Sequence, residues 1–286
     1  MPNAKTVSGY VGDTRFTVQM DLSDAAEASV QLRGHVAIVT AGGAGLGRHI
    51  ANAIAARGAH VVIGDLDPDV GQSVVGQIER DGGSATFVAV DVTDDGQLSQ
   101  AVATARQLGR IRALVNNAGG WSASGLQYPD SPPMDWSRVL DLNLRAPMLA
   151  AQLCIEAMKA DGGGAIVNIA SSGGLGPDPY GSPEYGAAKA GLIRFTSSLR
   201  GLDTTHGIRV SCVVAHWIGL ARAQAAFGQL SAEEQVRSGG LVDPEVVAAE
   251  VVHLIEDDES TGHIVAIRPR QAPYRLDPAA MDPYWR

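Results

Sequence analysis

Short apolar runs alternate with longer segments in which apolar side chains recur every three or four residues, beginning near residue 34. Nearly continuous apolar runs are typical of parallel strands buried on both faces, and the longer spacing is that of amphipathic helices. The runs predict strands at His35–Thr40, Ala59–Asp65, Ala85–Val90, Ile111–Asn116, Ala165–Ser171, Ile208–Val214 and Gly262–Ile267. The periodicity predicts helices at Leu46–Arg57, Val70–Arg80, Asp95–Leu108, Asp135–Lys159 (with a kink at Pro147), Glu184–Thr205 and Pro244–Asp257. The expected fold is α/β, a single doubly wound, seven-stranded parallel sheet with helices on both faces.

The alternation occupies residues 34–268 and leaves a segment on either side. Residues 1–33 contain two strand-like pieces, at Val7–Val11 and Arg15–Met20. This segment is interpreted either as an ordered or half-ordered extension or as an arm that packs on a partner subunit, and the sequence leaves both open. Residues 269–286 are rich in proline and aromatic side chains and have no period, so we expect an irregular tail.

Composition and charge narrow the class of protein. The chain is 45% apolar and 19% charged, and its 22 basic and 31 acidic residues give a net charge of −9. A chain this acidic is a poor partner for nucleic acid or anionic lipid, and no apolar run approaches the ~18–20 residues of a membrane-spanning helix. The N-terminus lacks the apolar core of a signal peptide, and Cys154 and Cys212 stand apart in apolar stretches. We expect a cytoplasmic protein without a disulfide framework, a metal, a nucleic-acid partner or a membrane partner.

A glycine-rich turn joins the first predicted strand to the first helix, with the sequence Thr40-Ala41-Gly42-Gly43-Ala44-Gly45-Leu46-Gly47. Glycines let a backbone approach a pyrophosphate, and the helix N-terminus offers free N–H groups and the positive end of its dipole. A tight β–α turn without a ligand is the structural alternative. Asp65 ends the second strand, 18 residues after Gly47, where a carboxylate can bind an adenosine ribose 2′-OH and repel a 2′-phosphate. Because Leu66 follows it instead of a basic residue, the sequence favours NAD over NADP.

Polar residues also follow two further strands at the expected ligand-binding edge of the sheet. Asp91-Val92 comes after the third strand, and Asn116-Asn117-Ala118-Gly119 comes at the end of the fourth. Asn and Asp are common turn formers at strand ends, which is the structural interpretation. Three such ends on one edge favour a binding crevice instead.

Tyr185 and Lys189 are spaced i,i+4 on the helix predicted to begin near Glu184, so the phenol and the ammonium share one face. An ammonium beside a phenol favours the phenolate and lowers the phenol pKa below about 10. Such a tyrosine can protonate or deprotonate an alcohol oxygen near neutral pH. The pair follows a strand that ends in Ser171-Ser172, where a hydroxyl can hydrogen-bond a substrate oxygen.

As a set, these motifs resemble the short-chain dehydrogenase/reductase family, classical subtype, over residues 34–268. The resemblance implies a Rossmann-type domain in which NAD contacts Gly45, Leu46, Gly47, Asp65, Asp91, Val92, Asn117, Gly119, Tyr185 and Lys189. It implies that Tyr185 is the general acid/base, that Lys189 binds the nicotinamide ribose and lowers the tyrosine pKa, and that Asn143 positions a water in the proton relay. By the same resemblance, the helices at Asp135–Lys159 and Glu184–Thr205 pair in a homodimer or homotetramer.

The family also implies a serine that orients the substrate carbonyl, and two candidates compete for this role. The pattern of a strand isoleucine, any residue and then the serine selects Ser171, after Ile169-Ala170. The usual gap of thirteen residues before the tyrosine selects Ser172. A one-residue insertion within 176–184 reconciles Ser171 with Tyr185, and Ser171 is the residue we predict.

The chain departs from the family pattern in the glycine-rich turn, after the sixth strand and after the last strand, where Arg268-Pro269-Arg270 replaces an acidic, glycine-rich ending. Ala41 replaces the first glycine of the turn, a change that is tolerated if its φ stays negative. Leu220 stands where a threonine hydroxyl meets the nicotinamide carboxamide, and Ala215-His216 replaces Pro-Gly after the sixth strand. His216 is therefore either an added polar group at the active site or a plain loop histidine.

The predicted function is NAD(H)-dependent interconversion of a secondary alcohol and a ketone on an apolar small molecule. Loops at 119–134, 173–184 and 215–242 are expected to shape the substrate pocket, with large side chains at Trp121, Leu126, Tyr128, Tyr180, Trp217 and Phe227. One alternative is a non-catalytic nucleotide-binding or scaffolding homologue, motivated by the altered nicotinamide loop. The other is an enzyme that uses bound NAD for epimerisation or dehydration.

Overall fold

The computed structural model describes residues 4–11, 14–21, 32–122, 124–176 and 181–276. Strands β1 (Ala4–Val11) and β2 (Thr14–Asp21) pair antiparallel in a two-stranded sheet of their own, with Val11 opposite Thr14. They confirm the two strand-like pieces expected near the N-terminus and show that these pieces pair with each other.

The large sheet has the strand order β10-β9-β8-β7-β6-β3-β4-β5. Its parallel strands are β3 (Val36–Thr40), β4 (His60–Asp65), β5 (Ser84–Ala89), β6 (Ile111–Asn116), β7 (Gly164–Ser171), β8 (Ile208–Ala215) and β9 (Ile264–Ile267). The prediction of seven parallel strands is confirmed. The expectation of an irregular tail is wrong at β10 (Tyr274–Leu276), which pairs antiparallel with β9. A strand of three residues is too short to show a period in the sequence.

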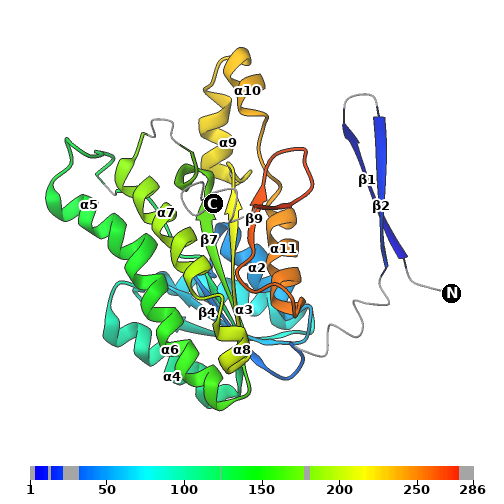
Figure 1. Cartoon of the computed structure of the whole chain (residues 1–286), viewed down its shortest axis with the longest axis vertical. Helices are drawn as coiled ribbons and strands as arrows, with labels where there is room; N and C mark the ends of the chain where they lie inside the picture. Colours follow the sequence, from blue (N-terminus) through cyan, green and yellow to red (C-terminus); the bar gives the residue numbers. More distant parts are fainter. Residues whose placement is uncertain (1–3, 12–13, 22–31, 123, 177–180, 277–286) are drawn as a thin grey trace.

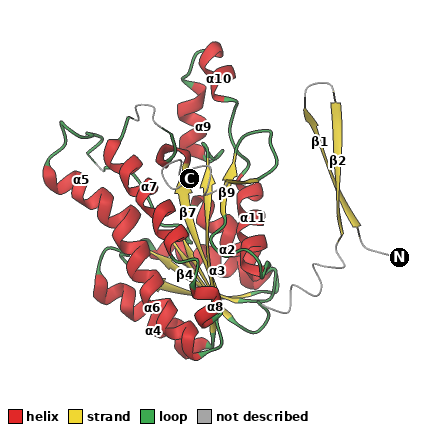
Figure 2. Ribbon diagram, viewed as in Figure 1, coloured by secondary structure: helices red, strands yellow, loops and turns green. Residues whose placement is uncertain are grey.

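Helices cover both faces of this sheet (Figure 2). One face carries α2 (Gly45–Ala55), α3 (Pro68–Arg80) and α11 (Pro244–Glu256), and the other carries α4 (Asp95–Leu108), α6 (Ala146–Ala160) and α7 (Pro183–Ser198). Side chains of successive strand residues point to opposite faces of the sheet. Ile38 packs on the α4–α6 side, and Val39 packs on the α2–α11 side. Of the helices described, none is long and apolar enough to cross a membrane.

Two helices predicted as continuous are interrupted. In place of Asp135–Lys159 the chain forms α5 (Pro133–Leu140), the π-helical turn η1 (Asp141–Arg145) and then α6. Pro147 lies in the first turn of α6 and has no N–H to donate into the turn before it, so the predicted kink takes the form of this wider turn. In place of Glu184–Thr205, α7 ends at Ser198 and α8 (Leu202–His206) follows after Gly201.

The segment 215–242 was expected to be a substrate loop, but most of it is helical. Helices α9 (Ala221–Gly228) and α10 (Ala232–Ser238) extend beyond the carboxyl ends of the strands (Figure 1). A bridge between Ile218 and Val242 closes the base of this excursion. Ser231 and Glu234 form a capping box that starts α10, and this S-x-x-E pattern is the signal in the sequence by which α10 could have been predicted.

Candidate active site

The carboxyl ends of β3, β6, β7 and β8 lie side by side and carry most of the predicted site residues. The chain runs outward from β3 to β4 and β5, and β6 then returns to the other side of β3. In a doubly wound sheet, ligands bind in the crevice outside the carboxyl ends at such a switch point. The glycine-rich turn after β3 and the segment 116–119 after β6 flank this crevice.

Side chains from β3 and β6 hold the glycine-rich turn in place. The Thr40 hydroxyl accepts hydrogen bonds from the backbone N–H groups of Asn117 (3.0 Å) and Ala118 (2.9 Å). The Asn117 amide donates to the carbonyls of Thr40 (3.0 Å) and Ala41 (3.1 Å). A Cβ on Gly47 would overlap the Ala41 carbonyl oxygen and lie 2.7 Å from Asn117 Nδ2. This is the close contact between helix and turn that the last glycine of a dinucleotide-binding turn permits.

Ala41 has a φ of 51°, in the left-handed region. The condition that φ stays negative at this position is therefore not met. The hydrogen bond from Asn117 to the Ala41 carbonyl helps to hold this conformation, which is unfavourable for an L-residue with a Cβ. The family glycine that Ala41 replaces would adopt it without that cost.

Replacing Ala41 with glycine is expected to raise the free energy of unfolding by roughly 1 kcal/mol, because relief of left-handed strain outweighs the added entropy of the unfolded chain. Denaturant unfolding measures the change. The matched control is Ala89→Gly at the exposed end of β5, where the same substitution is expected to destabilise the protein. An Ala41→Gly variant less stable than the parent would contradict the assignment of strain.

Asp65 lies at the end of β4, next to the turn. Its Oδ2 accepts a hydrogen bond from the Gly43 N–H (2.9 Å), and its Oδ1 accepts one from the Asp67 N–H (3.3 Å). Within the described residues, no cation forms an ion pair with this carboxylate, and the adjacent Leu66 is 70% exposed. A glycine cradle beside an unneutralised carboxylate fits an adenine dinucleotide with a free ribose 2′-OH.

Asp91 and Val92 follow β5 at this edge of the sheet, and their side chains have different surroundings. Oδ1 of Asp91 accepts hydrogen bonds from the N–H (2.9 Å) and the hydroxyl (2.7 Å) of Thr93, which fixes the turn. Val92 is buried in the core on the α4–α6 side, together with Ala118. Its side chain is therefore mainly a packing element.

Three predicted site residues meet at Gly119. A Cβ on this glycine would lie 2.8 Å from Asn143 Oδ1 and 3.1 Å from Lys189 Nζ. Asn143 is fully buried in the π turn, where its Nδ2 donates to the carbonyls of Gly120 (2.7 Å) and Val139 (2.9 Å). Its Oδ1 accepts from the Gly120 N–H (3.1 Å). The loop after β6 is thus tied to η1 and lies against the lysine of α7.

Lys189 lies buried between α7 and β7. Its Nζ donates to the Ile169 carbonyl at 2.8 Å and lies 5.6 Å from the centroid of the Tyr185 ring. Burial lowers the pKa of this ammonium from 10.5 to about 8. The structure thus brings the cation and the phenol together, as the i,i+4 spacing predicts.

A buried chain of hydrogen bonds, which the sequence analysis missed, lies beneath these residues. Asn116 Nδ2 donates to Asn168 Oδ1 (2.8 Å), and Asn168 Nδ2 donates to the Thr196 hydroxyl (2.9 Å). Asn116 also donates to the Pro147 carbonyl (3.2 Å). The chain joins β6, β7, α6 and α7, so it fixes the helix that carries Tyr185 and Lys189 against the sheet.

Ser171 is the last residue of β7, and its Oγ accepts a hydrogen bond from the Gly173 N–H (3.2 Å). Ser172 begins the short 3₁₀ turn η2 (Ser172–Gly174). A Cβ on Gly174 would lie 2.7 Å from the backbone of Lys189 and Ala190, so this turn packs directly on α7. Both serines therefore lie near α7, and the choice of Ser171 over Ser172 as the substrate-orienting serine stays a prediction.

Two contacts join the segment 119–133 to α7, the helix that carries Tyr185 and Lys189. The Trp121 ring meets the Tyr185 ring edge-on, with centroids 5.9 Å apart and an interplanar angle of 74°. The Tyr128 N–H donates to Oε2 of the buried Glu184 at 3.3 Å. Arg222 of α9 stacks on Trp121, with its Cζ 4.5 Å from the ring centroid. Sequence reasoning missed Arg222, because nothing in the chain indicates which ring an exposed arginine of α9 would meet.

Other side chains expected around the pocket are distributed unevenly. Leu126 and Tyr128 are 50% and 56% exposed, and Trp217 is 37% exposed. Phe227 lies in α9, and Tyr180 lies outside the described residues. Trp121 is the member of this set whose ring meets the Tyr185 ring.

His216 and Leu220 occupy the loop between β8 and α9. The His216 Nδ1 is buried and has no hydrogen-bond partner among the described residues, and burial together with the charge of Arg268 lowers the pKa of its imidazole. A Cβ on Gly45 would lie 3.4 Å from Leu220 Cδ1, so the leucine side chain borders the glycine-rich turn. Both departures from the family pattern thus lie at the crevice edge. In the described part of the chain, no three His, Cys, Asp or Glu side chains group as a metal site.

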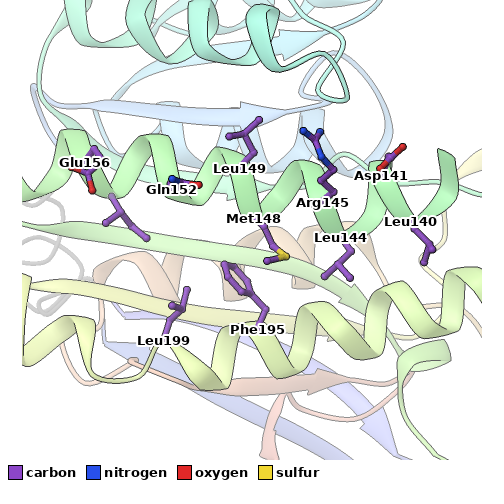
Figure 3. Close-up of a pocket in the computed structure, with 11 residues that line it drawn as sticks. Leu140, Asp141, Leu144, Arg145, Met148, Leu149, Gln152, Glu156, Phe195 and Leu199 are labelled. Atoms are coloured by element: carbon purple, nitrogen blue, oxygen red, sulfur yellow. The ribbon is translucent and has the colours of Figure 1, made fainter. Parts of the chain in front are cut away.

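A groove of about 510 Å³ lies away from this edge, on the outer surface of α6 and α7 (Figure 3). Leu144 and Met148 line it from η1 and α6, and Phe195 of α7 and Leu199, which directly follows α7, line it from the other side. None of the predicted catalytic residues lines it. The groove is therefore a separate surface feature.

Comparison with known proteins gives a consistent result. Residues 35–227 match the family model for short chain dehydrogenases. The chain is 31% identical to cyclopentanol dehydrogenase from Comamonas over 236 residues, which is 80% of this chain and 92% of that protein. It is 36% identical to an uncharacterized oxidoreductase of Thermotoga maritima over 188 residues, covering 65% of this chain and 72% of the relative.

Solved structures show the same likeness. A 7α-hydroxysteroid dehydrogenase complexed with NADH and 7-oxo glycochenodeoxycholic acid superposes with a TM-score of 0.76 at 27% identity, over 86% of this chain and 97% of that one. A short-chain type dehydrogenase/reductase from Mycobacterium marinum gives a TM-score of 0.75 at 29% identity, over 83% and 95% of the two chains. The chain therefore belongs to the short-chain dehydrogenase/reductase family and is an oxidoreductase of that family.

Proposed function

We propose that the protein interconverts a secondary alcohol and a ketone with NAD(H) as its cofactor. The observation that carries this proposal is the convergence of Tyr185, Lys189 and Asn143 beside the glycine-rich turn. When bound, the nicotinamide ring supplies or accepts the hydride. The names of two similar proteins, cyclopentanol dehydrogenase and 7α-hydroxysteroid dehydrogenase, support a substrate whose hydroxyl stands on an apolar skeleton.

Residues of this chain exchange the proton, orient the substrate oxygen and hold a water of the proton relay. Tyr185 exchanges the proton of the substrate oxygen, and the nearby Lys189 ammonium favours its phenolate form. Ser171 donates a hydrogen bond that orients the same oxygen. Both N–H groups of the Asn143 amide are bound to backbone carbonyls, so a water of the proton relay is held by the remaining lone pair of its Oδ1.

The cofactor site is assigned to Gly45, Leu46, Gly47, Asp65, Asp91, Val92, Asn117, Gly119, Tyr185 and Lys189. Gly45 begins α2, whose N-terminal N–H groups receive the pyrophosphate, Gly47 lets that helix pack closely on the turn, and Asp65 receives the adenosine ribose. The Asp65 carboxylate repels a ribose 2′-phosphate, which supports NAD over NADP.

Calorimetric titration of the cofactor-free protein with NADH and then NADPH is expected to give micromolar binding of NADH and binding of NADPH at least about tenfold weaker. Asp65→Asn is expected to narrow that difference, since it removes the charge. Asp69→Asn, at an exposed position in the first turn of α3, is the matched control and is expected to preserve it.

A preference for NADPH in the parent protein would contradict the proposal that Asp65 binds the adenosine ribose and repels a 2′-phosphate. Binding of neither nucleotide would favour a non-catalytic homologue. With NADH binding established, a panel of secondary alcohols and ketones is assayed through the nicotinamide absorbance. Turnover of none of them, with no net redox change, would favour epimerisation or dehydration over the proposed reaction.

A homodimer or homotetramer is proposed through the groove between α6 and α7. Members of this family are generally oligomeric, and the groove presents Leu144, Met148 (41% exposed), Phe195 and Leu199 on one surface. Sedimentation equilibrium tests this: Met148→Glu is expected to shift the assembly toward smaller species, and a monomeric parent protein at micromolar concentration would contradict it.

We place the enzyme in the cytoplasm. Cys154 and Cys212 are both free thiols buried in the core, which suits a reducing compartment. Fractionation of the source cells tests this placement, and recovery of the native enzyme outside the cytoplasm would contradict it.

A further inference from the structure

Arg222, in the first turn of α9, stands at the catalytic end of the molecule. Its guanidinium stacks on Trp121 with Cζ 4.5 Å from the ring centroid, and that ring in turn meets the Tyr185 ring at 5.9 Å. The cation is thus one aromatic ring away from the phenol. Figure 1 shows α9 beyond the carboxyl end of β7, where substrates of this fold bind.

The Cζ of Arg222 lies over the Trp121 ring at 4.5 Å, a distance at which a guanidinium can pack flat on an indole and keep its N–H edge free. A guanidinium packs on an indole through its flat face, while its five N–H groups point outward in the plane. Within the described residues, Arg222 makes no ion pair, whereas Arg237 on the neighbouring α10 pairs with Glu233 at 3.0 Å. The indole therefore holds the charge in place without neutralising it.

Further positive charge lies at the same edge, in a chain whose net charge is −9. Arg268 follows β9 directly and is exposed, and its charge contributes to the lowered pKa of His216 at the end of β8. Helix α9 contains no acidic residue. On α10, Glu233 is paired with Arg237 and Glu234 with the Ser231 cap. Arg222 and Arg268 thus bring two positive charges to this end of the sheet, where they can attract an anion.

We propose that Arg222 binds a carboxylate of the substrate, so that the substrate is a keto or hydroxy acid whose charge lies several bonds from the reacting carbon. This inference rests on the proposed function of Tyr185 and deepens it. A carboxylate accepts two parallel hydrogen bonds from the edge of a guanidinium, and the apolar skeleton between the two ends packs along Trp121. A neutral ester of the same length loses the charge-assisted part of these bonds, so the residue selects for the acid.

The test uses three ketones of increasing length, 4-oxopentanoate, 5-oxohexanoate and 6-oxoheptanoate, each paired with its methyl ester. Two quantities are measured for every compound: kcat/KM for reduction with NADH, and Kd by calorimetry on the cofactor-free chain, which needs no turnover. At least one acid is expected to exceed its ester by about tenfold or more in both. Arg222→Met is expected to abolish this preference, and added NaCl to reduce it.

Arg237→Met is the matched control, since it removes an exposed arginine of α10 that is paired with Glu233. It is expected to keep the preference for acids. The inference is overturned if the parent protein gives equal kcat/KM and Kd values for acids and esters. It is also overturned if the preference for acids survives Arg222→Met.

The affinity for NADH separates this role from a cofactor contact. It is expected to stay within about twofold in Arg222→Met; a loss as large as the loss of acid binding would assign Arg222 to the cofactor phosphates and overturn the inference. If the acids bind through Arg222 but no ketone is reduced, the anion site stands and the proposed function fails for these compounds. If acids and esters are reduced equally, the function stands and the anion site does not.

Discussion

Replacing Tyr185 with phenylalanine is expected to lower kcat by about 10²- to 10⁴-fold and to weaken NADH binding far less, because the ring that borders the cofactor site is kept. The substitution removes the phenolic O–H and keeps the ring. The ring retains its edge-on contact with Trp121 at 5.9 Å and its place 5.6 Å from Lys189 Nζ. What is lost is therefore the group that exchanges the proton, while the packing of the site is preserved.

Steady-state kinetics on a responsive alcohol or ketone, together with calorimetry for NADH, measures the two halves of this prediction. Tyr128→Phe is the matched control, because that tyrosine is 56% exposed on the neighbouring loop, and it is expected to keep kcat. Undiminished turnover by Tyr185→Phe would remove the proposed mechanism. A parallel loss of NADH affinity would show that the phenol serves binding instead of proton transfer.

The architecture was predictable because most of its parallel strands are buried on both faces, with the edge strand β5 as the exception. The run Val36–Thr40 is buried throughout in the structure, as are seven of the eight residues of β7. Such runs are readable without tertiary information. Parallel strands linked by helices place their carboxyl ends on one edge, so the order of motifs along the chain predicts which residues meet there.

Local geometry was predictable where one helix carries both partners. Tyr185 and Lys189 approach each other through the period of α7 alone. By contrast, the contact of Lys189 with Gly119 and Asn143 joins three segments that are far apart in sequence. It was expected through the family resemblance and not from periodicity.

Features set by tertiary contacts were not predictable. The left-handed φ of Ala41 goes with a hydrogen bond from the Asn117 amide, which belongs to the segment that follows β6. The stacking of Arg222 on Trp121 depends on where α9 sits over the sheet edge. The local sequence is that of an ordinary turn in the first case and of an exposed helix in the second. The contacts with Asn117 and with Trp121 are therefore visible only in the structure.

Replacing Lys189 with methionine is expected to inactivate the enzyme and to stabilise its fold near pH 7. The ammonium is 3% exposed, and burial lowers its pKa from 10.5 to about 8. At pH 7 the folded protein therefore holds a charge that the unfolded chain solvates better. A shift of this size corresponds to roughly 3 kcal/mol. Methionine has a similar length without the charge, although it forfeits the hydrogen bond to the Ile169 carbonyl at 2.8 Å.

The dependence on pH distinguishes this effect from a simple packing change. Between pH 8 and 10.5 the unfolded chain still binds the Lys189 proton while the folded protein has released it, so the parent protein gains stability from this group as pH rises. The Met variant has no such gain. Its stability advantage is thus largest below pH 8 and shrinks as pH rises through this window.

Denaturant unfolding at pH 7 and pH 9.5 measures this difference, with Lys159→Met as the control. Lys159 is a partly exposed lysine paired with Glu156 at 3.0 Å, and its variant is expected to show a small difference that does not change between the two pH values. A Lys189→Met variant that is less stable at pH 7 would mean that the bond to Ile169 outweighs the cost of the buried charge. Activity that survives the substitution would contradict the role of the ammonium, which lies 5.6 Å from the centroid of the Tyr185 ring.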